Sequence, residues 1–443
     1  MAVAGSDARA RARASTVLAS LASVLSLLLA PSVQADGGSP SPAPLEGRQQ
    51  ISLPLYATGT DPGRPGLYLS IGATVSDGSA TYSSPARSLI VDTGSSGLNI
   101  PYTFFNFPDH KLPNGFGPEE SIVSYSNTSL WGVRVSAATL QLGGSGDAGL
   151  TIENAPMSII TKKCSTDPQP VCDPDDVGFG IIGVDYWDSP YATNVFRWAP
   201  APFNTGFMIT TSVSDLSQAS QRDDAATRPI GQLVLGSLDP TGFISIALTQ
   251  LGQLTGAVAE ALLASGSSIN VWDHSLPGAC LSLNRETFGF ATATQIPLTL
   301  SPPISPADCQ GLVVPDSGGE GGFIDVPGPL PTGVDANQIS AMKVEVPGVF
   351  SYDFPVDPQV ALINAFSNAN PSLTINTGYR FFNSFDIYLD PVAGIEAFRP
   401  KDLAAAPAPL ALSGLAAGYR CNRCLRRRII RQRKQKAACR AGG

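Results

Sequence analysis

Two segments of the sequence repeat one pattern, and this repeat constrains the fold more than any other feature of the chain. Residues 89–100 read LIVDTGSSGLNI, and residues 313–324 read VVPDSGGEGGFI. When the two are aligned, Asp92 meets Asp316, and in each segment an apolar run leads into Asp-(Thr/Ser)-Gly. The chain is therefore expected to contain two related halves, each with one such loop.

The residues after each aspartate predict how the two loops bind each other. A carboxylate at the end of a buried apolar strand is costly unless it is hydrogen-bonded. Gly94 and Gly318 expose backbone N–H groups to the carboxylates, and the hydroxyls of Thr93 and Ser317 can bond across to the opposite loop. We therefore expect the loops to bring two carboxylates together.

Two adjacent carboxyl groups imply a definite chemistry. They cannot both ionise, so they share one proton and titrate as a pair. One carboxyl can then act as a base on a bridging water, while the other, protonated, acts as an acid toward a substrate carbonyl. This is a route to peptide hydrolysis without a metal, a histidine or a nucleophilic serine.

The composition fits such a chain. The sequence has 44 Gly and 38 Pro with only 14% charged residues, which favours a β-rich body with many turns over a helical bundle or a coiled coil. His110 and His274 are the only histidines, so metal sites and Ser–His or Cys–His catalysis built on histidine are nearly excluded. We expect no metal and no cofactor.

Charge is distributed unevenly along the chain. Residues 420–440 carry eight Arg and two Lys with no acid, although the whole chain has a net charge of −8. The body that precedes them is therefore strongly acidic. A nucleic-acid-binding protein would place basic residues on its folded body, so we expect no nucleic-acid partner.

Both ends of the chain predict an exported protein. Residues 1–35 combine several arginines, an apolar stretch and a small-residue cleavage site, which is the pattern of a secretory signal peptide. Residues 36–50 are typical of a flexible linker. The tail 402–443 has a short apolar segment before the basic run, a layout that resembles bacterial C-terminal sorting tails; a disordered basic tail is the alternative. That apolar segment is too short for a comfortable membrane span, and the signal peptide predicts a secreted or cell-surface location.

Cysteine usage agrees with export. Of the seven cysteines, four lie in the body. In an oxidising compartment these four can form two disulfides. The pairing cannot be deduced from the sequence, and the hypothesis of local pairing joins Cys164 to Cys172 and Cys280 to Cys309.

Strand-like runs bounded by turn residues dominate the body. The clearest are 66–75, 88–100, 133–142, 231–238 and 385–389. Residues 251–264 instead have helical spacing, with Gly266 near the expected end of the helix. We predict a mostly-β chain with an N-terminal lobe over 51–240 and a C-terminal lobe over 241–401.

The motifs resemble those of pepsin-like aspartic proteases, and the likeness extends over most of 60–400. VDTGSSGL, at 91–98, closely resembles the first active-site motif of that family. Residues 120–144 resemble its flap hairpin, with Tyr125 where the flap tyrosine would be. Residues 377–398 are similar to its closing strands.

The resemblance implies a bilobal pepsin-like acid protease fold, with two β-barrel-like lobes and an active-site cleft between them. It implies a secreted aspartic endopeptidase, a divergent bacterial member of the family, which acts as a monomer on a protein or peptide substrate. The implied site consists of catalytic Asp92 and Asp316, the loop residues Thr93, Gly94, Ser95, Ser317 and Gly318, and the flap residue Tyr125.

The second motif departs from the family pattern. Gly319 and Glu320 replace the usual Ser/Thr pair. Ser95 can bond the outer oxygen of Asp92, but Gly319 has no side chain to do the same for Asp316. Losing a hydrogen bond to the ionised form tends to raise the pKa of a carboxyl. The difference therefore predicts the acid role for Asp316 and the base role for Asp92.

Two alternatives follow from this altered loop. Asp325 also has an apolar lead and is a rival for the second aspartate, although no Ser or Thr follows it. The second alternative concerns function: a catalytically impaired pepsin-like binding protein at the cell surface, with the cleft kept for a ligand.

Overall fold

The computed structural model describes residues 50–401 with gaps. The residues left out within this range are 60–63, 125–127, 144–148, 166–170, 174–176, 178–179, 187–191, 214, 284–285, 291–296, 301–308, 310, 320–322, 328–340, 355–361 and 367–373. The predicted signal peptide (1–35) and tail (402–443) lie outside the described residues. So does the predicted linker (36–50), except that Gln50 already begins a strand.

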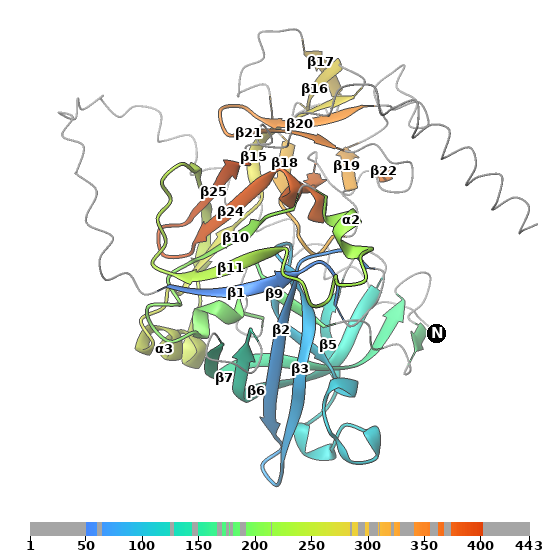
Figure 1. Cartoon of the computed structure of the whole chain (residues 1–443), viewed down its shortest axis with the longest axis vertical. Helices are drawn as coiled ribbons and strands as arrows, with labels where there is room; N and C mark the ends of the chain where they lie inside the picture. The colour runs from blue at the N-terminus through green and yellow to red at the C-terminus, as the bar shows by residue number, and fades with distance from the viewer. Residues whose placement is uncertain are drawn as a thin grey trace, which may run out of the picture. The chain divides into compact units, whose positions relative to one another are not determined.

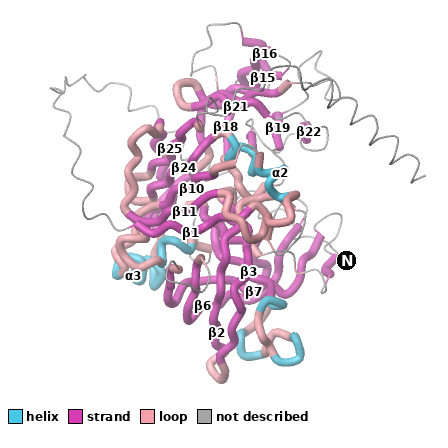
Figure 2. Tube along the Cα trace, viewed as in Figure 1, coloured by secondary structure: helices cyan, strands magenta, loops and turns pink. Residues whose placement is uncertain are grey.

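Strands make up most of the described chain (Figure 2). The α-helices in the described ranges are α2 (Leu216–Ser220) and α3 (Gly256–Ala264). Short 3-10 helices occur at Tyr102–Phe104, Pro108–His110, Asn114–Phe116, Val195–Trp198 and Tyr379–Asn383. None of the described helices is long and apolar enough to cross a membrane. The prediction of a mostly-β fold is confirmed.

The larger sheet has 14 strands among the described residues (Figure 1). In spatial order they are β12 (Ile244–Ala247), β25 (Ile395–Pro400), β24 (Phe385–Asp390), β10 (Phe207–Thr211), β11 (Gly231–Gly236), β1 (Gln50–Tyr56), β2 (Tyr68–Ser76), β3 (Thr81–Asp92), β9 (Ile181–Val184), β4 (Ser96–Pro101), β7 (Leu150–Ser165), β6 (Thr128–Leu142) and β5 (Glu120–Ser124), with β8 (Val171–Asp173) paired to β7. Strands β12, β24 and β25 join this sheet through the β24–β10 pair. The predicted lobe boundary near residue 240 is therefore crossed by a continuous sheet, and the lobe ranges stay predictions.

A second sheet carries the second aspartate loop. Its strands, in order, are β17 (Pro297–Leu300), β16 (Glu286–Phe290), β15 (Leu276–Leu283), β18 (Gly311–Val314), β23 (Thr374–Asn376), β19 (Phe323–Pro327) and β22 (Leu362–Phe366). Off this order, β20 (Met342–Val346) pairs with β15, and β21 (Phe350–Phe354) pairs with β20. A separate pair is formed by β13 (Thr249–Gln253) and β14 (Asn270–Asp273). The five predicted strand runs all coincide with strands, and the run over 88–100 is broken by the turn after Asp92.

The helix predicted over 251–264 is shorter than expected. The chain up to Gln253 belongs to β13, which pairs with β14, and α3 starts only at Gly256. The prediction is wrong for the first turn because long-range strand pairing overrides helical spacing there. The expected end is confirmed: Gly266 follows the helix with a φ of +76°, a left-handed conformation that glycine adopts without steric cost.

The two aspartate strands belong to two copies of one four-strand arrangement. In the first copy β3 runs parallel to β9, β9 antiparallel to β4, and β4 parallel to β7. In the second copy β18, β23, β19 and β22 repeat these relations in the same order. Asp92 is the last residue of β3, and Asp316 follows β18 closely. The fold therefore delivers both aspartates from equivalent positions, as the sequence repeat predicts.

One large cluster of buried apolar side chains includes residues of both sheets. It contains Val91 and Val313, which lie on the two strands that lead to the aspartates. Phe350, Phe381 and Phe398 form an aromatic group within it, with ring centroids 5.2 to 5.9 Å apart. Complete burial of such side chains stabilises the fold by about 1.5–3 kcal/mol each, so the aspartate strands are firmly anchored.

Both disulfides of the local-pairing hypothesis are present. Cys164–Cys172 joins β7 to β8. Cys280–Cys309 joins β15 to the chain that enters β18. The second disulfide thus lies on the approach to the loop that carries Asp316.

Candidate active site

Thr93 and Ser317 join the two aspartate loops through reciprocal hydrogen bonds. The backbone N–H of Thr93 donates to Oγ of Ser317 at 3.1 Å, and that of Ser317 donates to Oγ1 of Thr93 at 3.0 Å. Each hydroxyl also donates to a main-chain carbonyl of the other loop, Thr93 to Pro315 and Ser317 to Val91, both at 2.6 Å. Both side chains are buried. The structure therefore brings together two loops that lie 224 residues apart in the sequence.

Each carboxylate is also held by its own loop. Oδ1 of Asp92 accepts the backbone N–H of Gly94 at 2.8 Å, and Oδ2 accepts the hydroxyl of Ser95 at 2.6 Å. Oδ1 of Asp316 accepts the backbone N–H groups of Gly318 and Gly319 at 2.8 and 2.9 Å. Loop residues of both repeats thus serve as donors to the carboxylates.

The two carboxyl groups contact each other. They lie close enough for one to affect the ionisation of the other, and both aspartates are buried, with 8% and 9% of their surfaces exposed. The backbone of each loop lies against the carboxyl group of the other. A Cβ on Gly94 would lie 2.7 Å from Cγ of Asp316, and one on Gly318 would lie 2.3 Å from Cγ of Asp92.

The environment makes Asp92 hard to ionise. Burial raises the pKa of Asp92 well above its usual value, and the charge of Asp316 and the hydrogen bond to that carboxyl raise it further. The donors from Ser95 and Gly94 offset only part of this shift. Asp92 can therefore keep its proton above the ordinary pKa of an aspartate, which leaves an acid in the pair for general acid–base chemistry.

Asn376 supplies a contact that the sequence-based prediction missed. Its Nδ2 donates to Oδ2 of Asp316 at 2.5 Å. The expectation that Asp316 lacks a donor to its outer oxygen, because Gly319 has no side chain, is therefore wrong. The amide comes from β23, a strand whose register against β18 is not visible in a single sequence.

Arg64 is a further neighbour of the site, and no motif marks it. Its Nη2 donates to the carbonyl of Gly318 at 3.2 Å. Its own carbonyl accepts the hydroxyl of Tyr68 at 3.1 Å. A guanidinium group thus lies beside the second aspartate loop.

The rival aspartate, Asp325, lies in the middle of β19. Its backbone is in register with Thr374 of β23 on one side and Asn364 of β22 on the other. Asp316, in contrast, lies in the loop that contacts Asp92. The described contacts thus place the carboxyl of Asp316 beside that of Asp92.

The predicted flap tyrosine, Tyr125, lies outside the described residues, but the hairpin around it is described. Strands β5 and β6 pair antiparallel on either side of the gap at 125–127. Ile122 and Val123 of β5 and Leu130 of β6 pack in one cluster with Ile90, which lies just before Asp92. The hairpin therefore rises next to the strand that carries the first aspartate.

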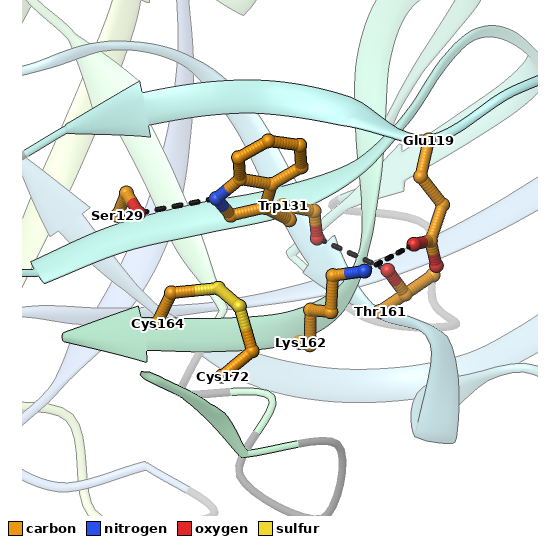
Figure 3. The surroundings of a disulfide bond; sticks show 7 residues. All are labelled: Glu119, Ser129, Trp131, Thr161, Lys162, Cys164 and Cys172. Atoms are coloured by element: carbon orange, nitrogen blue, oxygen red, sulfur yellow. Dashed lines mark hydrogen bonds and ion pairs between the residues drawn. A yellow bond between two sulfur atoms is a disulfide. The ribbon is translucent and has the colours of Figure 1, made fainter. Parts of the chain in front are cut away.

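A disulfide and a charged pair flank this hairpin (Figure 3). Nζ of Lys162, on β7, lies 2.6 Å from Oε2 of Glu119 and 5.6 Å from the ring centre of Trp131 on β6. The indole N–H of Trp131 donates to Oγ of Ser129 at 3.1 Å. The hydrogen bond from Lys162 lowers the pKa of Glu119. The base of the hairpin is thus tied to the strand that carries Cys164.

A second buried group of titratable side chains lies apart from the aspartate pair. Nδ1 of His274 lies 3.0 Å from Oδ1 of Asp185, and Glu396 is 2% exposed. Burial alone lowers the pKa of His274, but the nearby carboxylates, Asp185 above all, raise it to about 9. Burial raises the pKa of Glu396 to about 8, although His274 offsets part of the shift. These groups make the stability of the body depend on pH.

The comparisons with known proteins found similarity among solved structures. No family model and no curated protein matches the chain. Among solved structures, the chain is similar to an aspartic proteinase from Irpex lacteus, with 13% sequence identity and a TM-score of 0.44. The match covers 81% of this chain and 99% of that one.

Proposed function

We propose that this chain is an aspartic endopeptidase in which Asp92 and Asp316 together activate water. The observation that carries the proposal is the contact between the two carboxyl groups. Reciprocal bonds of Thr93 and Ser317 fix that contact. Two buried carboxyls that share a proton provide a base and an acid at one point, which is what hydrolysis of an amide needs.

The proposed reaction runs through a tetrahedral intermediate. The ionised carboxylate takes a proton from a water molecule, whose oxygen attacks the peptide carbonyl carbon. The protonated carboxyl donates its proton to the carbonyl oxygen, which gives a geminal diol. In the second step the carboxyl that took the water proton donates it to the amine nitrogen, and the C–N bond breaks. One hydroxyl of the diol gives its proton to the other carboxylate as the carboxylic acid and the amine leave. The pair then holds one proton again, so the cycle closes.

Other features support the substrate class and location. The β5–β6 hairpin beside β3 suits a flap that covers an extended peptide. Two disulfides suit an oxidising compartment, in keeping with a secreted or cell-surface protein.

The main argument for the binding-protein alternative is weakened by a donor from outside the loop. It rested on the missing hydroxyl at Gly319, which leaves the outer oxygen of Asp316 without a loop donor. The amide of Asn376 donates to that oxygen instead. The altered loop is therefore compatible with a working pair of carboxyls.

Cleavage of an unfolded protein by the purified chain tests the proposal. We expect cleavage in acid that stops when a statyl peptide inhibitor is added. Asp92→Asn and Asp316→Asn should abolish it, because Asn keeps the shape but cannot act as a base or an acid. Asp325→Asn is the matched control and should remain active.

Two results would overturn the proposal. If the parent cleaves nothing between roughly pH 2 and 7, which brackets carboxyl titration, while it still binds the inhibitor, the binding-protein alternative takes over. If Asp325→Asn is inactive and Asp316→Asn is active, the second aspartate has been misassigned.

A further inference from the structure

The two copies of the four-strand arrangement differ at one position beside the aspartates. In the first copy, Ile181 of β9 is in register with Ile90 of β3 and Asn99 of β4. In the second copy the corresponding place on β23, between β18 and β19, is occupied by Asn376. An apolar residue in one half is thus replaced by an amide in the other.

The orientation of this amide is fixed by the backbone. Oδ1 of Asn376 accepts the backbone N–H of Gly378 at 2.9 Å. The NH2 end therefore faces Oδ2 of Asp316, at 2.5 Å. The flipped amide would turn its oxygen toward a carboxylate and its NH2 toward an N–H donor, and both contacts would be repulsive.

Gly319 makes room for the amide. A Cβ at this position would lie 3.0 Å from Oδ2 of Asp316 and 3.2 Å from Oδ1 of Asn376. The loop is tied down there, because the backbone N–H of Tyr379 donates to the carbonyl of Gly319 at 2.9 Å. The missing side chain and the added amide are therefore two parts of one arrangement.

The two outer oxygens now have donors of different chemistry. A hydroxyl such as that of Ser95 can donate to a carboxylate or accept from a protonated carboxyl. The NH2 of Asn376 can only donate, so its partner oxygen on Asp316 must be an acceptor. The outer oxygen of Asp92 can therefore carry the shared proton and donate it to Ser95. Both oxygens of Asp316 already accept N–H groups, the outer one from Asn376 and the inner one from the loop backbone.

We infer that Asn376 is a positioning residue of the pair, which keeps Asp316 ionised and so assigns the shared proton to Asp92. This inference rests on the proposed function only for its catalytic consequence. Asp316 is then the base toward water, and Asp92 is the acid toward the carbonyl oxygen. The assignment is the reverse of the one that the sequence alone predicts. The burial that raises the pKa of Asp92 acts in the same direction.

A titration that does not need turnover tests the proton assignment. Protein labelled with carbon-13 at the aspartate carboxyl carbons gives the protonation state of each carboxyl by NMR, and the Asp92→Asn and Asp316→Asn variants assign the two signals. At about pH 5, which is above the ordinary range of aspartate, we expect Asp92 to be protonated and Asp316 ionised. The reverse assignment would overturn the inference whether or not the protein cleaves peptides.

A mutational cycle tests the role of the amide. Asn376→Ala should lower kcat by roughly 100-fold, the usual effect of a misplaced catalytic group, with little change in KM. The acidic limb of the pH profile should move to higher pH, because the pair takes up its second proton more readily without the donor. Gly319→Ser in the Asn376→Ala background should raise kcat at least tenfold above that of Asn376→Ala alone, because a hydroxyl then occupies the vacated space. Gly319→Ser in the parent should lower kcat, since a side chain there would lie too close to Asp316 and Asn376.

Controls separate this role from a structural one. Asn106→Ala removes an exposed amide that accepts the backbone N–H of Ser83, and it should leave the pH profile unchanged. If Asn376→Ala loses activity with an unshifted profile and Gly319→Ser does not restore it, Asn376 is only structural and the inference is wrong. A parent that shows the expected NMR assignment but cleaves nothing would contradict the proposed function alone.

Discussion

Gly318 lies directly against the carboxyl group of Asp92: a Cβ atom added to this glycine would be 2.3 Å from Cγ of the aspartate. Gly94 and Asp316 show the same relation at 2.7 Å. Real Cβ atoms do not approach other atoms so closely, so glycine is needed here for the close approach of the two loops.

Gly318→Ala should therefore slow the proposed cleavage by roughly 100-fold. The new methyl group must push the loops apart, and a displacement of about 1 Å at a catalytic group costs roughly 100-fold in rate. The thermal unfolding temperature should also fall, since the reciprocal bonds of the loops would stretch. Gly252→Ala, in β13, is the control, because a Cβ there meets nothing within 4 Å. A Gly318→Ala variant that cleaves as fast as the parent would contradict the close contact.

Ser317→Ala should destabilise the body by about 3 kcal/mol. The substitution leaves the carbonyl of Val91 and the N–H of Thr93 without partners in a buried place, at about 1–3 kcal/mol each. Urea unfolding of the two proteins measures the difference. Ser220→Ala, which removes a single bond to the carbonyl of Ser217 at the end of α2, should cost much less. An equal cost for the two variants would show that the loops are not coupled.

Asp92→Asn should make the protein more stable than the parent at neutral pH. The folded state holds the proton of Asp92 more tightly than the unfolded state, because its pKa is raised. Stability from this group is therefore present below the unfolded pKa and is lost as pH rises toward the folded one. The asparagine variant has no such loss. Its unfolding temperature should match that of the parent near pH 3 and exceed it near pH 7, whereas the exposed Asp223→Asn should show no such trend.

Glu396→Gln should weaken the pH dependence of stability above pH 5. Glu396 has its pKa raised to about 8 and His274 to about 9. Both raised values mean that stability is lost as pH rises, from 4.5 toward about 8 for Glu396 and from 6.5 toward about 9 for His274. Glutamine removes the first loss and keeps the second. Unfolding temperatures measured from pH 5 to 9 check this, with the exposed Glu260→Gln on α3 as the control; identical slopes in all three proteins would contradict it.

The aspartate loops were predictable because their information is local. Apolar residues, an aspartate, a hydroxyl and a glycine follow one another within a few positions, and the same order occurs twice. The strand registers preserve the spacing: Ile90 and Asn99 pair with one residue of β9, and Val314 and Phe323 pair with one residue of β23. A local pattern that is repeated thus predicts a symmetric site.

The donor to Asp316 could not be predicted in this way. Asn376 follows Ile375 on a short strand, 60 residues after the aspartate, and only the sheet register makes them neighbours. The first turn of the predicted helix near Leu251 fails for the same reason, since β14 captures that segment by pairing. The reason for the loop glycines was also only partly predicted: they donate N–H groups as expected, but the contact with the opposite carboxyl is a tertiary feature.

The reciprocal bonds of Thr93 and Ser317 also limit when the paired loops can form during synthesis of the chain. A growing chain that contains Asp92 but has not yet reached Ser317 has only half of the pair, however well its first strands are folded. The second half must then be made, enter its own sheet and dock before either hydroxyl finds its partner. The paired aspartate loops can therefore form only after residue 317 has been synthesised, and a chain released before that point holds the first loop alone.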